Sequence, residues 1–229
     1  MNAEQCWNVI VDMHNDYHQN LKHHKYTYNK FVPNDKRMHE FMEIENPTAQ
    51  QVEHYRDIFL NEIYNESDLK KLDNTIINSV IPKMQMAIEG KIKPLANKWG
   101  IKLPEQLDIA CAYGWGGSYY PGEKPVILFR VSDYPTELSP YRTFVHEFVH
   151  ILIEEPIIIK YNVPQNLKEN IVDIICLELF GLEPINHFDR SFAKTYITPE
   201  AIRTDLVGVV KKMMADYTTF KQAQSTKDR

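Results

Sequence analysis

The feature that most constrains this chain is a helical segment that is apolar on most sides and still carries His146, Glu147 and His150. Ser139 is a favourable N-cap and Pro140 a favourable first residue, so we expect a helix that runs through these residues and ends before the next proline. Residues four apart lie on one helix face, so the two histidines point the same way. Buried imidazole and carboxylate groups need polar partners, which the rest of the fold must supply.

The spacing His146-Glu147-x-x-His150 is the HExxH pattern, in which two imidazoles hold one metal ion and the glutamate reaches a water molecule beside it. Chance alone would place this pattern in roughly 3 of 100 chains of this composition, so its context matters. A hydrogen-bonded pair of core side chains is the alternative for such a helix. A catalytic zinc ion takes three protein ligands, so a third ligand must come from elsewhere.

A second helix, predicted from near Pro164 to Gly181, contains candidates for the missing partners. Glu169 follows His150 by 19 residues, and Asp173 lies one turn further on the same helix face. Glu169 can complete a metal site, while Asp173 can accept the second N–H of a ligating histidine. Either residue alone would be read as part of a solvated acidic face, but the pair at this spacing after the motif favours a metal site.

HExxH followed about twenty residues later by ExxxD resembles the gluzincin, or thermolysin-like, zinc metallopeptidases. The resemblance covers roughly residues 106–182. It implies a zincin-like fold and a Zn²⁺ ion as cofactor, and it gives each motif residue a role: His146, His150 and Glu169 as zinc ligands, Glu147 as general base, and Asp173 as the partner of a ligating histidine.

The same resemblance extends to three further positions. Tyr161 is placed like the tyrosine that stabilises the oxyanion in this family, and His187 is the candidate for its downstream histidine, although it lies much closer to Glu169 than the family places it. Pro125–Val131 would correspond to the family's edge strand, which pairs with extended substrate. The segment 114–117 does not match the GxMEN motif of gluzincin aminopeptidases, so exopeptidase activity of that kind is not supported.

Apolar periodicity elsewhere predicts further elements. Helices are expected over 48–65, from Ser67 to Gly100 with a kink or split at Pro82, and over 198–221, and a further strand over Leu107–Ala112. The stretch 113–123 holds four of the eight glycines and is predicted as a loop or a long hairpin turn, in which Trp115, Tyr119 and Tyr120 could either overhang the site or pack internally. We therefore expect an α+β fold: a mainly helical N-terminal region, residues 1–100, and a zincin-like unit, residues 101–229, with a small sheet and two metal-bearing helices.

Composition narrows the possible partners. The net charge of -5 argues against nucleic-acid binding, and no signal peptide or membrane-spanning stretch is visible, so we expect a cytoplasmic protein without a membrane partner. Cys6, Cys111 and Cys176 form no CxxC pair, which excludes a thiolate zinc knuckle and gives no sign of a disulfide framework. Cys176 is expected to be a core thiol.

These observations together predict a zinc-dependent hydrolase, and among these a peptidase that acts on peptide or protein substrates. The alternative is a non-catalytic zincin-fold protein with a binding or regulatory role. A di-iron helix bundle would need two E-x-x-H motifs, and only one is present. His14 and His18 are also four apart, near Asp12 and Asp16, but we favour a solvated polar N-terminus over a second metal site. No oligomeric state is predicted.

Overall fold

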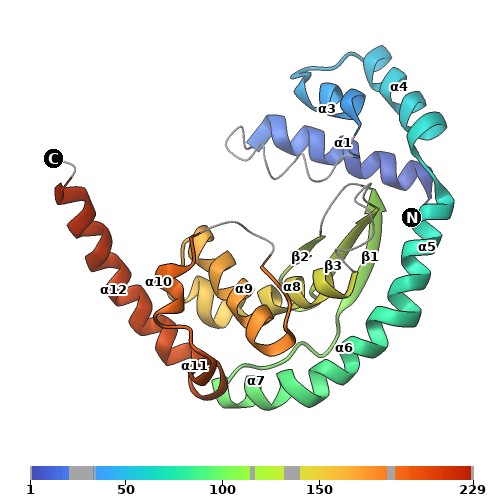
Figure 1. Ribbon diagram of the computed structural model, residues 1–229. Helices are drawn as coiled ribbons and strands as arrows, with labels where there is room; N and C mark the ends of the chain where they lie inside the picture. The colour runs from blue at the N-terminus through green and yellow to red at the C-terminus, as the bar shows by residue number, and fades with distance from the viewer. Residues whose placement is uncertain are drawn as a thin grey trace. The chain divides into compact units, whose positions relative to one another are not determined.

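The structure is a computed structural model that describes residues 2–20, 33, 35–113, 117–131, 140–184 and 189–227 (Figure 1). The chain is a mixed α+β protein, in which many helices accompany one three-stranded sheet. It forms two compact units, and each takes segments from both sides of residue 100. Unit 1 comprises residues 1–81, 109–118 and 127–143; unit 2 comprises residues 82–108, 119–126 and 144–229.

Unit 1 contains the helices α1 (Ala3–Asn20), α3 (Lys36–Glu43), α4 (Ala49–Ile58) and α5 (Glu66–Thr75). Thr48 caps α4 with a capping box that includes Gln51, as the predicted start at residue 48 requires. Trp7 and Phe41 are central to an aromatic core, with ring centroids 5.4 Å apart. The buried members of this core are Cys6, Trp7, Ile10, Met38, Phe41, Met42, Phe59, Leu69 and Tyr113.

The expectation of a solvated N-terminus around His14 and His18 is wrong. His14 is only 2% exposed, and its Nε2 lies 2.8 Å from the carbonyl oxygen of Ile44. His18 Nε2 lies 3.0 Å from the carbonyl oxygen of Met42. Both imidazoles thus bond to carbonyl groups at the C-terminal end of α3, which helix geometry leaves without intrahelical partners. The two histidines serve as helix caps in the structure.

Short π-helical turns interrupt the helices between Phe59 and Gly100. They are η2 (Phe59–Ile63), η3 (Ile76–Val80) and η4 (Ile88–Ile92), and the last two are followed by α6 (Ile81–Ala87) and α7 (Lys93–Trp99). The break expected at Pro82 is found as η3, which ends just before this proline, and Pro94 likewise follows η4. Proline lacks an N–H and displaces regular helix hydrogen bonds, which a wider turn accommodates. Gly100, at φ 68°, ends α7 as expected.

The sheet has the order β1-β3-β2, with β1 at Asp108–Tyr113, β2 at Gly117–Tyr120 and β3 at Val126–Val131. Two expectations are corrected. Part of the predicted loop 113–123 forms β2, and β3 is the central strand, so the assignment of Pro125–Val131 to an edge is wrong. Pro125 lies just before β3 and accepts a hydrogen bond from the Asp108 N–H through its carbonyl, for which no proline N–H is needed.

Unit 2 contains most of α8 (Pro140–Ile153) and all of α9 (Gln165–Phe180), the helices that contain the His-Glu motif and Glu169 (Figure 1). The π-turn η5 (Glu154–Ile159) continues α8 through Pro156, beyond the end predicted from the sequence. Gly181, at φ 67°, ends α9 as predicted. The predicted helix 198–221 is instead divided at Asp205. Its two parts are α11 (Pro199–Thr204) and α12 (Leu206–Lys227), and the four-residue α10 (Ser191–Lys194) precedes them.

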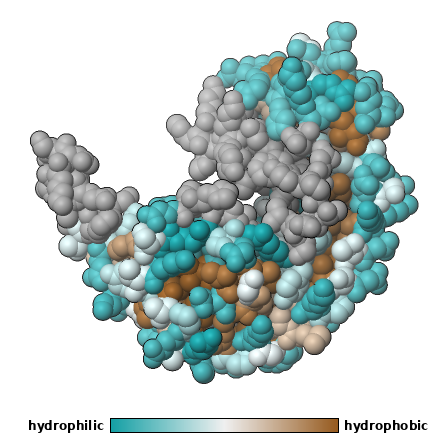
Figure 2. Space-filling view, in the orientation of Figure 1, coloured by the Kyte–Doolittle hydropathy of each residue, from teal (hydrophilic) through white to brown (hydrophobic). Residues whose placement is uncertain are grey.

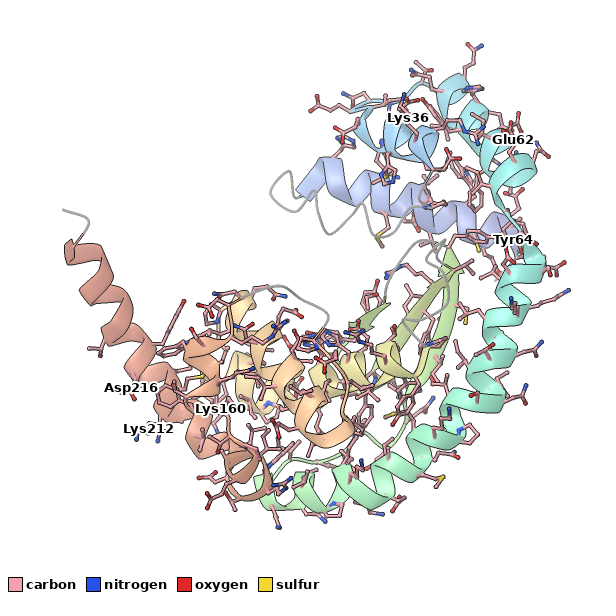
Figure 3. All side chains as sticks on the ribbon, in the orientation of Figure 1. Lys36, Glu62, Tyr64, Lys160, Lys212 and Asp216 are labelled. Carbon is pink, nitrogen blue, oxygen red and sulfur yellow. The ribbon has the colours of Figure 1, made fainter. Side chains whose placement is uncertain are left out.

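Charged side chains are exposed on the helices of each unit. In unit 1, Arg37 pairs with Glu62, and Lys36 lies 3.4 Å from Glu40; in unit 2, Tyr196 donates to Asp216. Figure 3 labels Lys36, Glu62 and Asp216. Hydrophilic residues cover much of the face seen in Figure 2. Within the described ranges, no helix is both long and apolar enough to cross a membrane.

Candidate metal centre

The helices α8 and α9 bring three potential ligands together. His146 Nε2 and His150 Nε2 lie 3.1 Å apart on one face of α8. Glu169 Oε2, from α9, lies 3.5 Å from the first nitrogen and 3.3 Å from the second. Glu169 therefore points towards the two histidines, as the helical spacing predicted. Among the described residues, this is the group of three that could hold a metal ion.

The separations of these three atoms fit one ion of the size of zinc. They lie on a circle with a radius of about 1.9 Å, slightly less than the zinc–ligand distances of about 2.0–2.2 Å. All three atoms can therefore contact a single ion at once. Two imidazole nitrogens and one carboxylate oxygen are also donors that zinc accepts, and three protein ligands are the number typical of catalytic zinc sites.

The electrostatics of the group also favour a cation. Burial alone would lower the pKa of His146, but the hydrogen bonds of its imidazole with Cys176 and Glu169 outweigh it and raise this pKa to about 10. Burial alone would raise the pKa of Glu169, but the two imidazoles outweigh it and lower this pKa far below its usual range. The group thus stabilises positive charge beside a carboxylate, and either protons or a metal ion can supply that charge.

Glu147 is buried next to the three ligand candidates without belonging to their group. It is 8% exposed, although carboxylates are rarely buried unless they are paired. Its negative charge contributes to the raised pKa values of both His146 and Tyr119, so it lies within electrostatic reach of each. This placement suits a base that acts beside a metal ion without binding it, and the role itself stays a prediction.

Asp173 lies behind His146, one helical turn after Glu169. Its Oδ1 is 3.6 Å from His146 Nδ1, slightly longer than a hydrogen bond, and its side chain is almost fully buried. Arg190, a residue that the sequence did not single out, holds the other carboxylate oxygen at 3.0 Å. A small movement would let Asp173 accept the His146 N–H, which is the role that the sequence predicted for it.

His150 is held differently from His146. Its Nδ1 is buried, and no side chain or backbone group in the described parts of the chain forms a hydrogen bond with it. Its ring instead stacks on Tyr119 of β2, with centroids 4.7 Å apart and planes 7° apart. Tyr119 donates a hydrogen bond of 2.7 Å to Glu154 and accepts one of 2.8 Å from Lys168. The sequence left the role of Tyr119 open, and no spacing rule could have paired it with His150.

The remaining candidates are less informative. Tyr161 has the Lys160 ammonium 5.5 Å above its ring, and its proposed contact with an oxyanion is not tested. His187 lies outside the described residues, as does Asp133, which would be an alternative ligand if Glu169 proved not to bind. Glu154 and Glu155 are two further alternatives. Glu154 accepts a hydrogen bond from Tyr119, and Glu155 lines a separate cavity.

Unit 2 also has a cavity of about 610 Å³, lined by parts of 100–105 and 121–125 and by Ile151, Leu152 and Glu155. None of the three ligand candidates lines it. Ile151 and Leu152 follow His150 directly on α8 and point away from its face, as helical geometry requires. This cavity is therefore distinct from the candidate metal centre.

Comparison with known protein families, with curated proteins and with solved structures gives no match for this chain.

Proposed function

We propose that this protein is a zinc-dependent hydrolase that cleaves peptide bonds. The observation that carries the proposal is the convergence of His146 Nε2, His150 Nε2 and Glu169 Oε2 within 3.5 Å of one another. The neighbouring buried Glu147 adds the base that such a reaction needs.

A zinc ion held by His146, His150 and Glu169 would polarise the substrate carbonyl group and lower the pKa of water towards about 7. Glu147 then accepts a proton from the attacking water molecule and passes it to the leaving amine. Tyr161 is proposed, from the family resemblance alone, to donate a hydrogen bond to the developing oxyanion. Asp173 orients the His146 imidazole and keeps its Nε2 directed towards the metal position.

The experiment that tests this function is digestion of a proteome-derived peptide library by the zinc-loaded wild-type protein and by Glu147→Gln. The variant keeps the shape of the side chain but cannot accept the proton, so cleavage should fall on the order of 100- to 10,000-fold. Zinc content should stay unchanged, because Glu147 does not bind the metal.

A cleavage pattern that survives in a folded, zinc-loaded Glu147→Gln protein would contradict the role of this base. Stoichiometric zinc without cleavage by the wild-type protein would instead favour the alternative, a zincin-fold protein with a binding or regulatory role. Glu155→Gln is a matched control, because Glu155 lies on η5 and lines the separate cavity.

A further inference from the structure

Three side chains that the proposed mechanism does not use form a cluster against the metal centre. They are Tyr119 on β2, Glu154 on η5 and Lys168 on α9. We propose that Tyr119 is a positioning residue that fixes the His150 imidazole in its metal-binding orientation by stacking on it. This inference rests on the proposed function, because it concerns a ligand of the proposed zinc site.

His150 needs such a device because none of the described protein groups forms a hydrogen bond with its Nδ1. A ligating histidine almost always donates its second ring N–H to a carboxylate, a carbonyl group or water, which fixes the ring orientation. His146 has Asp173 beside its Nδ1, whereas the buried Nδ1 of His150 finds no hydrogen-bond partner among the residues that the structure describes. The ring of His150 is instead held by a nearly parallel aromatic face, with planes 7° apart.

Tyr119 can act in this way only if its own ring is fixed. Its hydroxyl donates to Glu154 Oε2 at 2.7 Å and accepts from Lys168 Nζ at 2.8 Å. Lys168 also lies 3.4 Å from Glu154 Oε2, and both side chains are largely buried. The cluster therefore ties β2 to η5 and α9, and it fixes the Tyr119 ring through its hydroxyl group.

The same contacts argue against a direct catalytic role for Tyr119. Its hydroxyl donates its one proton to Glu154, so none remains for an oxyanion. Lys168 directly precedes Glu169, so the anchor of Tyr119 and the third ligand candidate share one turn of α9. Helix α9 therefore contributes both to the metal site, through Glu169, and to the support of His150, through the contact of Lys168 with Tyr119 on β2.

The test is zinc affinity, measured by competition with a chromophoric chelator, together with the visible absorption spectrum of the Co²⁺-loaded protein. Tyr119→Leu removes the planar ring and should weaken zinc binding on the order of 10- to 100-fold, with an altered Co²⁺ spectrum. Tyr119→Phe keeps the ring but loses the hydroxyl contacts that fix it, so its zinc affinity should lie between those of Tyr119→Leu and the wild type. Tyr120→Leu, the exposed neighbour on β2, is the matched control and should bind like the wild type.

If Tyr119→Leu does not fold, Tyr119→Met decides, because methionine fills irregular space without a planar ring. Wild-type zinc affinity and an unchanged Co²⁺ spectrum in the folded Leu or Met variant would overturn this inference alone. Failure of the wild-type protein to bind zinc would overturn both this inference and the proposed function. Zinc binding without hydrolysis would affect only the proposed function, since neither readout here depends on activity.

Discussion

At the scale of single residues, the two histidines of the motif differ in what lies behind them. His146 has the carboxylate of Asp173 at 3.6 Å, and Arg190 in turn holds that carboxylate. A carboxylate behind a ligating imidazole raises the basicity of the ring and fixes its orientation. The ExxxD spacing was enough to predict the position of Asp173, because two residues four apart on a helix face the same partner.

Asp173→Asn should therefore weaken zinc binding without abolishing it, on the order of 10-fold, because the amide is a poorer acceptor of the His146 N–H. Chelator competition measures the change. Glu178→Gln, on the same helix, is the control and should bind zinc like the wild type. An affinity unchanged in Asp173→Asn would show that this carboxylate does not act on His146.

Other residue-scale features could not be predicted from the sequence. Tyr119 and Arg190 lie far from the motif in sequence. They reach the centre only through tertiary packing, Tyr119 from β2 and Arg190 from the residue directly before α10. Neither residue follows a spacing rule, since stacking and long-range ion pairs depend on tertiary packing. Helical periodicity thus predicted the three ligand candidates, but not the contacts of Tyr119 and Arg190 that support them.

At the scale of elements, local sequence signals predicted the ends of helices better than the position of a strand within the sheet. Thr48, Gly100 and Gly181 end or begin helices where expected, because caps depend on a few neighbouring residues. The position of β3 in the centre of the sheet depends on which strands pair with it. One of these strands, β2, lies in the stretch 113–123, where no strand was predicted. Helix α1 was missed because its polar histidines bond to α3, a contact that periodicity does not reveal.

The contact between α1 and α3 leads to a prediction about pH. Burial is the main cause that lowers the pKa of His14 below its usual value of about 6.5. The unfolded chain therefore binds a proton at this site more readily than the folded chain, and stability falls as pH drops below about 6.5. His18 is the titratable neighbour, with ring centroids 4.6 Å away, and its charge lowers the pKa of His14 further.

Urea unfolding at pH 7.5 and at pH 5.0 should show this loss of stability in the wild type. His14→Gln can still donate to the Ile44 carbonyl group but does not titrate, so its stability should fall less between the two pH values. His54→Gln, an exposed histidine of α4, should behave like the wild type. Equal pH dependence in wild type and His14→Gln would rule out a contribution from the buried imidazole.

At the scale of the whole molecule, the α+β class was predicted correctly from the textures of the two parts of the sequence. The compact units of the structure combine segments from both sides of residue 100, because strands and helices distant in sequence pack together. The zincin-like character of the fold stays part of the proposal, and it rests on α8, α9 and the small sheet.

A metal that binds only the folded chain should raise the stability of the whole protein. Zinc at a free concentration 100 times its dissociation constant would stabilise the folded state by about 2.7 kcal/mol. The thermal midpoint should rise by several degrees in the wild type and much less in Glu169→Ala. Differential scanning calorimetry with and without zinc measures the effect, and an equal rise in both proteins would place the bound metal elsewhere.

X-ray absorption spectroscopy of the purified, zinc-loaded protein tests the central claim most directly, when combined with elemental analysis of zinc per chain. The account predicts about one zinc ion per chain, with two imidazole nitrogens and a carboxylate oxygen at about 2.0–2.2 Å, and a large loss of zinc in Glu169→Ala. A wild-type protein that binds no zinc, or a Glu169→Ala variant with the same zinc content and ligand shell, would contradict it.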